Sequence, residues 1–140
     1  MKGNKNIIIT SLKRIEVQGG DVLHSIKDSD QGFNGFEEAY FSWINPEVVK
    51  AWKKHNKMTL NLVVPVGEVK FVFYYPELDN KFHEEVIGEN NYKRITVPPE
   101  IWFGFKGESH SSSLVLNVAN IKHDPNEVQN EPISRFNYEW

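Results

Sequence analysis

The stretch that decides the fold runs from Val48 to Tyr75, VVKAWKKHNKMTLNLVVPVGEVKFVFYY. A cluster of cations that includes His55 leads directly into two segments, 60–66 and 69–75, which are rich in β-branched and aromatic residues. These segments predict two strands joined by a tight turn at Gly67. An ionisable imidazole and several lysines therefore stand beside a hydrophobic sheet.

The rest of the chain repeats this pattern of short strands separated by Gly, Pro and Asn. The one plausible helix start is Asn45-Pro46, and we expect at most one turn there before the next strand. We interpret 98–110 as a separating loop and 124–140 as an irregular tail, whose alternating aromatics predict that it is tied down. Further strands are expected at 7–10, 14–17, 21–26, 37–44, 82–87, 94–97 and 113–121. The pattern predicts an all-β sandwich or barrel.

Length and composition restrict the class of protein. A chain of 140 residues suits one domain, here residues 1–140, and a formal charge of −3 argues against general nucleic-acid binding. There is no cysteine, and no apolar run is long enough to span a bilayer. The opening residues do not have the pattern of a signal peptide, so we expect a cytoplasmic protein without membrane partners.

The lysine-rich stretch carries the candidate chemistry. In an extended chain, residues 49, 51, 53 and 55 share one face, and Lys50, Trp52 and Lys54 lie opposite. The functional interpretation makes His55 a proton-transfer group and lets Lys53, Lys54 or Lys57 hold a phosphate or pyrophosphate. The alternative is a solvated basic loop in which His55 makes a routine hydrogen bond.

Other candidate binding and catalytic groups are scattered along the chain. In VPPEIWFGF, residues 97–105, Trp102 or Phe103 could stack on a sugar or base ring, although core packing explains the cluster as well. The candidate polar substrate contacts are Asn61 and Asn117. The tyrosines at 40, 74, 75 and 138 are possible general acids, and we retain Tyr74 and Tyr138.

Metal and nucleophile motifs are missing from the sequence. The five histidines are scattered, with no His-x-His or His-x-x-x-His pair, so we expect neither a metal nor another cofactor. Residues 109–113 are rich in serine but lack the glycine-flanked turn that exposes a serine nucleophile.

Three segments, LVVPVGEVKFVFYY (62–75), ITVPPEIWFGF (95–105) and LVLNVANIKHDPNE (114–127), resemble the dTDP-4-dehydrorhamnose 3,5-epimerase family of RmlC-like cupins. The resemblance covers roughly residues 46–128. It implies a cupin double-stranded β-helix (jelly-roll) barrel, a homodimer and a substrate that is a nucleotide-linked, dTDP-type 4-keto sugar. Family members remove a proton beside the ketone with a histidine and return it from a tyrosine, without metal or cofactor.

The resemblance also assigns roles to residues. With one inserted residue in 51–55, His55 takes the position of the base; without the insertion, Lys53 does. Phe103 stands where a metal-binding cupin often carries histidine. The family's tyrosine has no counterpart in 119–122, and the aspartate that orients its histidine has none in the tail.

The sequence therefore predicts an epimerase or isomerase of a nucleotide-linked 4-keto sugar, acting in surface-polysaccharide biosynthesis. Two alternatives stay open. One is a non-catalytic sugar-nucleotide-binding cupin module, and the other is a metal-dependent cupin enzyme.

Overall fold

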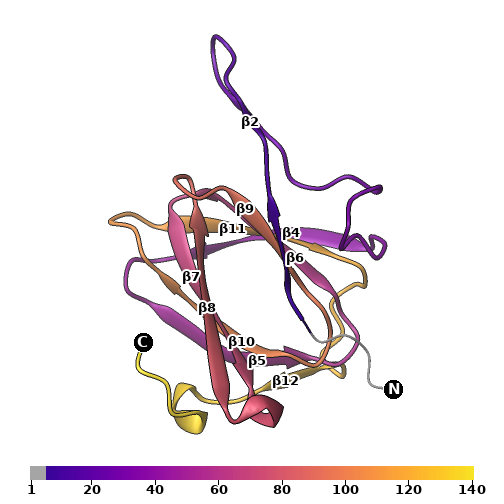
Figure 1. The fold of residues 1–140 in the computed structure, drawn as a ribbon, viewed down its shortest axis with the longest axis vertical. Helices are drawn as coiled ribbons and strands as arrows, with labels where there is room; N and C mark the ends of the chain where they lie inside the picture. The colour runs from indigo at the N-terminus through magenta and orange to yellow at the C-terminus, as the bar shows by residue number, and fades with distance from the viewer. Residues whose placement is uncertain (1–5) are drawn as a thin grey trace.

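A computed structural model describes residues 6–140, which form two five-stranded antiparallel sheets and a small separate hairpin (Figure 1). The first sheet has the strand order β1-β9-β6-β11-β4, and the second has the order β12-β5-β10-β7-β8. The first sheet's strands are β1 (Ile8–Ser11), β4 (Glu38–Ile44), β6 (Leu60–Val66), β9 (Lys93–Val97) and β11 (Ser113–Ala119). The second sheet's are β5 (Val49–His55), β7 (Glu68–Tyr75), β8 (Lys81–Gly88), β10 (Trp102–Gly107) and β12 (Val128–Asn130).

Period-two alternation turns one face of each strand toward the space between the sheets. In β11, Ser113, Val115, Asn117 and Ala119 are buried, while the residues between them are only partly buried. The inward faces of both sheets build one core, whose buried members include Ile44, Leu60, Leu62, Val64, Phe71, Phe73, Ile87, Ile95, Val97, Phe103 and Val115. The all-β prediction is confirmed. That residues 1–140 form one domain stays a prediction.

Two segments differ from the sequence prediction. The expected loop 98–110 contains β10, which lies centrally in the second sheet between β5 and β7. Pro98-Pro99 does end β9, but the chain resumes an extended course at Trp102 because it has a partner strand on each side. The irregular tail contains β12, which pairs with the end of β5.

No helical turn forms at Asn45-Pro46. The chain turns there instead, and Glu47 adopts a positive φ of 64° before β5 begins. In the part of the chain that the structure describes, helical structure is limited to two 3-10 turns, η1 (Pro76–Leu78) and η2 (Ile133–Arg135). No helix within residues 6–140 has the length and apolar character needed to cross a membrane. The signal-peptide expectation falls partly on residues 1–5, which lie outside the described range.

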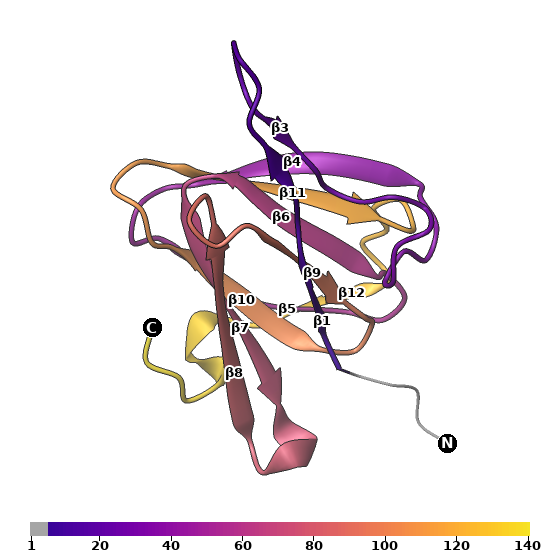
Figure 2. The ribbon, with the colours of Figure 1, turned by 45° about the horizontal axis from the view of Figure 1, so that its top comes forward.

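The C-terminal tail covers the outer face of the second sheet (Figure 2). Trp52 is 1% exposed, and its indole N–H donates to the Ile133 carbonyl at 3.1 Å. We call the residues around it the outer aromatic cluster: Trp52, Tyr74, Phe82, Trp102, Phe136, Tyr138 and Trp140. The prediction that the aromatic tail is tied down is confirmed.

Gly104 allows the tail and β5 to approach β10. A Cβ at this position would lie 2.5 Å from the Ala51 Cβ and 3.0 Å from the Trp140 ring. The first distance is shorter than real Cβ contacts and the second is tighter than most of them, so glycine fits without a shift where the tail, β5 and β10 meet.

The N-terminal part of the chain projects and then returns over the first sheet. Strands β2 (Arg14–Ile15) and β3 (Val22–Leu23) form a hairpin that stands away from the body (Figure 2). The chain after β3 is held by Arg94, which is fully buried and donates to the Ser25 carbonyl at 2.6 Å. The segment held by this contact lies over the outer face of β9.

Trp52→Ala should lower the free energy of unfolding by about 3–5 kcal/mol, because it removes a large buried ring and leaves a cavity in the outer aromatic cluster. Leu78→Ala, at a site that is 53% exposed, is the control and should change stability by about 0.5 kcal/mol or less. Urea unfolding of both variants gives the comparison. Equal losses would contradict the view that the tail is packed on Trp52.

Candidate functional site

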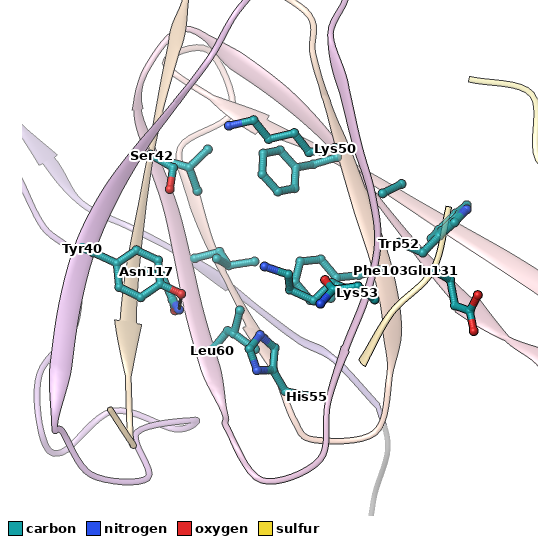
Figure 3. A pocket seen from close by; sticks show the side chains of 15 residues that line it. Tyr40, Ser42, Lys50, Trp52, Lys53, His55, Leu60, Phe103, Asn117 and Glu131 are labelled. Carbon is teal, nitrogen blue, oxygen red and sulfur yellow. Dashed lines mark hydrogen bonds between the residues drawn. The ribbon is translucent and has the colours of Figure 1, made fainter. Parts of the chain in front are cut away.

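A cavity of about 420 Å³ lies between the two sheets (Figure 3). This volume is in the range of small-molecule sites. Both sheets contribute to the wall, and the lining residues are Tyr40, Ser42, Lys50, Ala51, Trp52, Lys53, His55, Leu60, Leu62, Phe103, Phe105, Val115, Asn117, Asn130 and Glu131. Polar groups therefore converge on a space with an apolar floor.

His55 is held at the cavity wall by Glu127. The His55 Nδ1 atom lies 2.5 Å from Glu127 Oε1, and both side chains are buried. The other carboxylate oxygen, Oε2, accepts the backbone N–H groups of Lys57 at 3.0 Å and Met58 at 3.2 Å. The carboxylate is therefore fixed on both sides, and it fixes the imidazole ring in turn.

The protonation states follow from these contacts. Burial lowers the pKa of His55 below its ordinary value of 6.5, and the nearby Lys53 adds to that effect, although Glu127 opposes it. Burial acts to raise the pKa of Glu127, but hydrogen bonds from His55 and from the two amides outweigh it and hold the pKa low. At neutral pH the pair is a carboxylate and a neutral imidazole protonated on Nδ1. The lone pair of Nε2 is then available as a base.

A bulge in β5 brings two lysines to the cavity. Phe103 pairs with Lys53 and Gly104 pairs with Ala51, so Trp52 is an extra residue opposite β10. Trp52 packs outward, and Lys50 and Lys53 both line the cavity. Simple alternation predicted Lys50 on the opposite face, and the bulge is the reason that this was wrong. The Lys50 ammonium reaches across to the Trp43 carbonyl at 2.9 Å.

Tyr40 reaches the cavity from the first sheet. It lies on the edge strand β4, directly opposite Asn117 on β11, and the Asn117 amide nitrogen is 3.0 Å from its hydroxyl oxygen. Figure 3 shows the two side chains together on the wall that faces Lys53. The cavity thus combines a base, two cations and a phenol.

The structure places four of the predicted site residues at the cavity: Lys53, His55, Phe103 and Asn117. The others lie elsewhere. Tyr74 and Tyr138 belong to the outer aromatic cluster; the Tyr74 hydroxyl donates to Asn80 at 2.6 Å, and the Tyr138 hydroxyl donates to Glu84. Burial and the Glu84 carboxylate both raise the pKa of Tyr138. Neither hydroxyl lines the cavity.

The remaining predicted binding residues are also not part of the cavity lining. The Lys54 ammonium lies over the outward-facing Trp102 ring, 5.2 Å from its centroid. The backbone N–H of Lys57 supports Glu127. Asn61 is buried on the far side of the first sheet, where its side chain accepts from Thr96 and donates to the Gly32 carbonyl.

Sequence reasoning missed Glu127 and did not retain Tyr40. Glu127 sits in a polar tail, where no alternation of apolar residues marks a buried position. Its place at the end of the matched segment 114–127 was the available signal. Tyr40 was one of several tyrosines that spacing could not separate. Within residues 6–140, no group of three His, Asp or Glu side chains is arranged to hold a metal ion.

Known proteins provide an independent comparison. A dTDP sugar isomerase from Desulfovibrio desulfuricans has a solved structure that matches this one with a TM-score of 0.91 and 31% identity, over 97% of this chain and 91% of that chain. The dTDP-4-dehydrorhamnose 3,5-epimerase of Sulfolobus tokodaii matches with a TM-score of 0.79 at 17% identity, over 94% and 80% of the two chains. These matches confirm the predicted cupin jelly roll.

A curated relative supports the same family relationship. The protein named "Probable low-salt glycan biosynthesis epimerase Agl13" of Haloferax volcanii is 31% identical over an alignment of 102 residues that covers 69% of this chain. The match spans 65% of the length of that relative. No protein-family model matches the chain.

Glu127→Gln should reverse the tautomer of His55. Because two backbone N–H groups face Oε2, the glutamine must place its oxygen there and turn its NH₂ group toward Nδ1, which moves the ring proton to Nε2. The ¹⁵N shifts of the two ring nitrogens report the tautomer. Glu131→Gln, at a carboxylate that does not touch His55, is the control. Retention of the Nδ1-protonated form in Glu127→Gln would disprove the arrangement.

Proposed function

Because the chain belongs to the RmlC-like cupin family of dTDP-sugar isomerases and dTDP-4-dehydrorhamnose 3,5-epimerases, we propose that it is an isomerase of a nucleotide-linked 4-keto sugar. The observation that carries the proposal is the buried His55–Glu127 pair on the wall of a cavity whose other wall holds Tyr40. The reaction is a proton transfer at the carbon beside the ketone.

His55 is the proposed base. Its Nε2 lone pair takes the proton from the carbon beside the C4 ketone, and the electrons of that C–H bond form an enolate. The imidazolium that results is stabilised by the Glu127 carboxylate at 2.5 Å. A buried carboxylate fixed by two amides does this without reorganising, which is how a preorganised site lowers a barrier.

Lys50 and Lys53 are the proposed cationic contacts. Both lysines line the cavity, so one can stabilise the enolate oxygen and the other can pair with the diphosphate. The apolar floor formed by Leu60, Leu62 and Val115 excludes water there and strengthens these interactions.

Tyr40 is the proposed acid. Its O–H bond breaks as a new C–H bond forms, and the negative charge of the enolate passes to the phenolate oxygen. Tyr40 lies on the first sheet and His55 on the second, so protons leave and arrive from different walls. Delivery to the opposite face of the carbon inverts its configuration. Tyr40 takes the role for which the sequence analysis retained Tyr74 and Tyr138.

Isotope exchange tests this assignment. With dTDP-4-keto-6-deoxyglucose in D₂O, His55→Gln should lower deuterium incorporation beside the ketone by about 10²–10⁴-fold, because the base is lost. Tyr40→Phe should keep the exchange and lose the isomerised product, since the enolate still forms. NMR follows both events.

His83→Gln, which lies outside the cavity, is the control and should change neither rate. Saturable binding of the dTDP-sugar without exchange at any pH would support the non-catalytic binding module instead. A stoichiometric metal in the active protein would support the metal-dependent cupin.

The pH dependence has a defined sign. The lowered pKa of His55 means that the neutral base predominates at pH 7, so kcat/KM should be flat there and decrease as the pH falls below 6.5. The midpoint of that decrease should lie below 6.5. A midpoint above that value would show that the base is not in a desolvated position.

Assembly, location and pathway stay predictions. A homodimer is supported by the exposed aromatic side chains Phe41 and Trp43 on the edge strand β4 and by Ile15 and Val22 on the projecting hairpin. A cytoplasmic location and a place in surface-polysaccharide biosynthesis are proposed on the sequence argument alone.

A further inference from the structure

The Asn117 side chain has only one possible orientation. Its Oδ1 atom lies 3.1 Å from the backbone nitrogen of Asn61, and a backbone N–H group can only donate. The oxygen must therefore face Asn61, and the NH₂ group must face Tyr40 at 3.0 Å. The same nitrogen lies 3.8 Å from the Met58 sulfur, which is a weak acceptor for its second hydrogen. The buried amide cannot turn over without placing two donors face to face.

This orientation determines the role of the Tyr40 hydroxyl. Asn117 donates, so the Tyr40 oxygen accepts. The hydroxyl proton must then take the other in-plane position on that oxygen. Within residues 6–140 no acceptor for this proton is found, although the ring lines the cavity.

Three of the other four tyrosines show the opposite arrangement. Tyr74 donates to the Asn80 side chain at 2.6 Å, Tyr92 donates to the His24 carbonyl at 2.7 Å, and Tyr138 donates to Glu84. Each of these protons is held by the protein. The Tyr40 proton is left for solvent or for a molecule in the cavity.

We propose that Asn117 is a positioning residue that directs the Tyr40 proton into the cavity and stabilises the phenolate left after the proton is donated. The inference rests on the proposed acid role of Tyr40. A hydrogen bond to a charged oxygen is stronger than one to a neutral oxygen, so the Asn117 contact gains strength as the proton leaves. Solvent then returns a proton to Tyr40 and accepts the proton from the His55 imidazolium, which completes the cycle.

Asn117→Asp tests the proposal with almost no change of shape. One carboxylate oxygen keeps the contact with the Asn61 N–H, and the other replaces the NH₂ group and accepts the Tyr40 proton. Formation of isomerised product from dTDP-4-keto-6-deoxyglucose should fall by about 10²-fold, toward the rate of Tyr40→Phe. Deuterium incorporation beside the ketone should remain, which also shows that the variant is folded.

Asn120→Asp is the matched control. The Asn120 side chain accepts the Thr59 N–H at 2.8 Å in the same way, but it does not contact Tyr40. This variant should keep both rates. Asn117→Ala, which adds no charge, is a second variant and should also lower product formation more than exchange.

Double substitution supplies the decisive readout. Asn117→Asp should cause no further loss in a Tyr40→Phe background, because the two residues act as a unit. Additive losses, equal losses of exchange and product, or unchanged product formation in Asn117→Asp would each overturn the inference. If Tyr40→Phe itself keeps normal product formation, the acid assignment under the proposed function fails instead.

Discussion

The contact between His55 and Glu127 is the constraint on which the site depends. It joins the end of β5 to the start of the C-terminal tail, two segments that are 72 positions apart in the chain. The carboxylate also accepts two backbone N–H groups, so it has no freedom to leave the imidazole. Because both partners are buried, the ring is presented to the cavity in one tautomer and in one direction.

The tail that brings Glu127 to the site is itself secured by packing. After Glu127 the chain pairs with β5, and the backbone of Glu131 exchanges hydrogen bonds with Trp52 at 2.9 and 3.0 Å. The aromatic residues that follow enclose the Trp52 ring on the outer face of the sheet. Strand β5 therefore has the site on one side and the outer aromatic cluster on the other.

Local patterns predicted most of the fold. The strands at 60–66 and 69–75 were recognisable because they are rich in β-branched and aromatic residues and are bounded by turn residues. Strand β10 was missed because Pro98-Pro99 and Gly104 resemble a loop, and only its two partner strands make it extended.

The site was less predictable than the fold. His55 was singled out by its cationic neighbours, and the structure does place it at the cavity. A bulge in β5 turns Lys50 toward the cavity, and a segment distant in the sequence brings Glu127 to His55. The position of Tyr40 depends on its cross-strand neighbour Asn117. None of these relations produces a periodic pattern in the sequence, so residue spacing alone could not identify them.

Strands β4 and β12 both form edges of their sheets, and residues on or just beyond these strands line the cavity. One edge strand of each sheet therefore borders the cavity. On the proposed function, selectivity for one sugar over another then depends on the few side chains of these two edges that line the cavity.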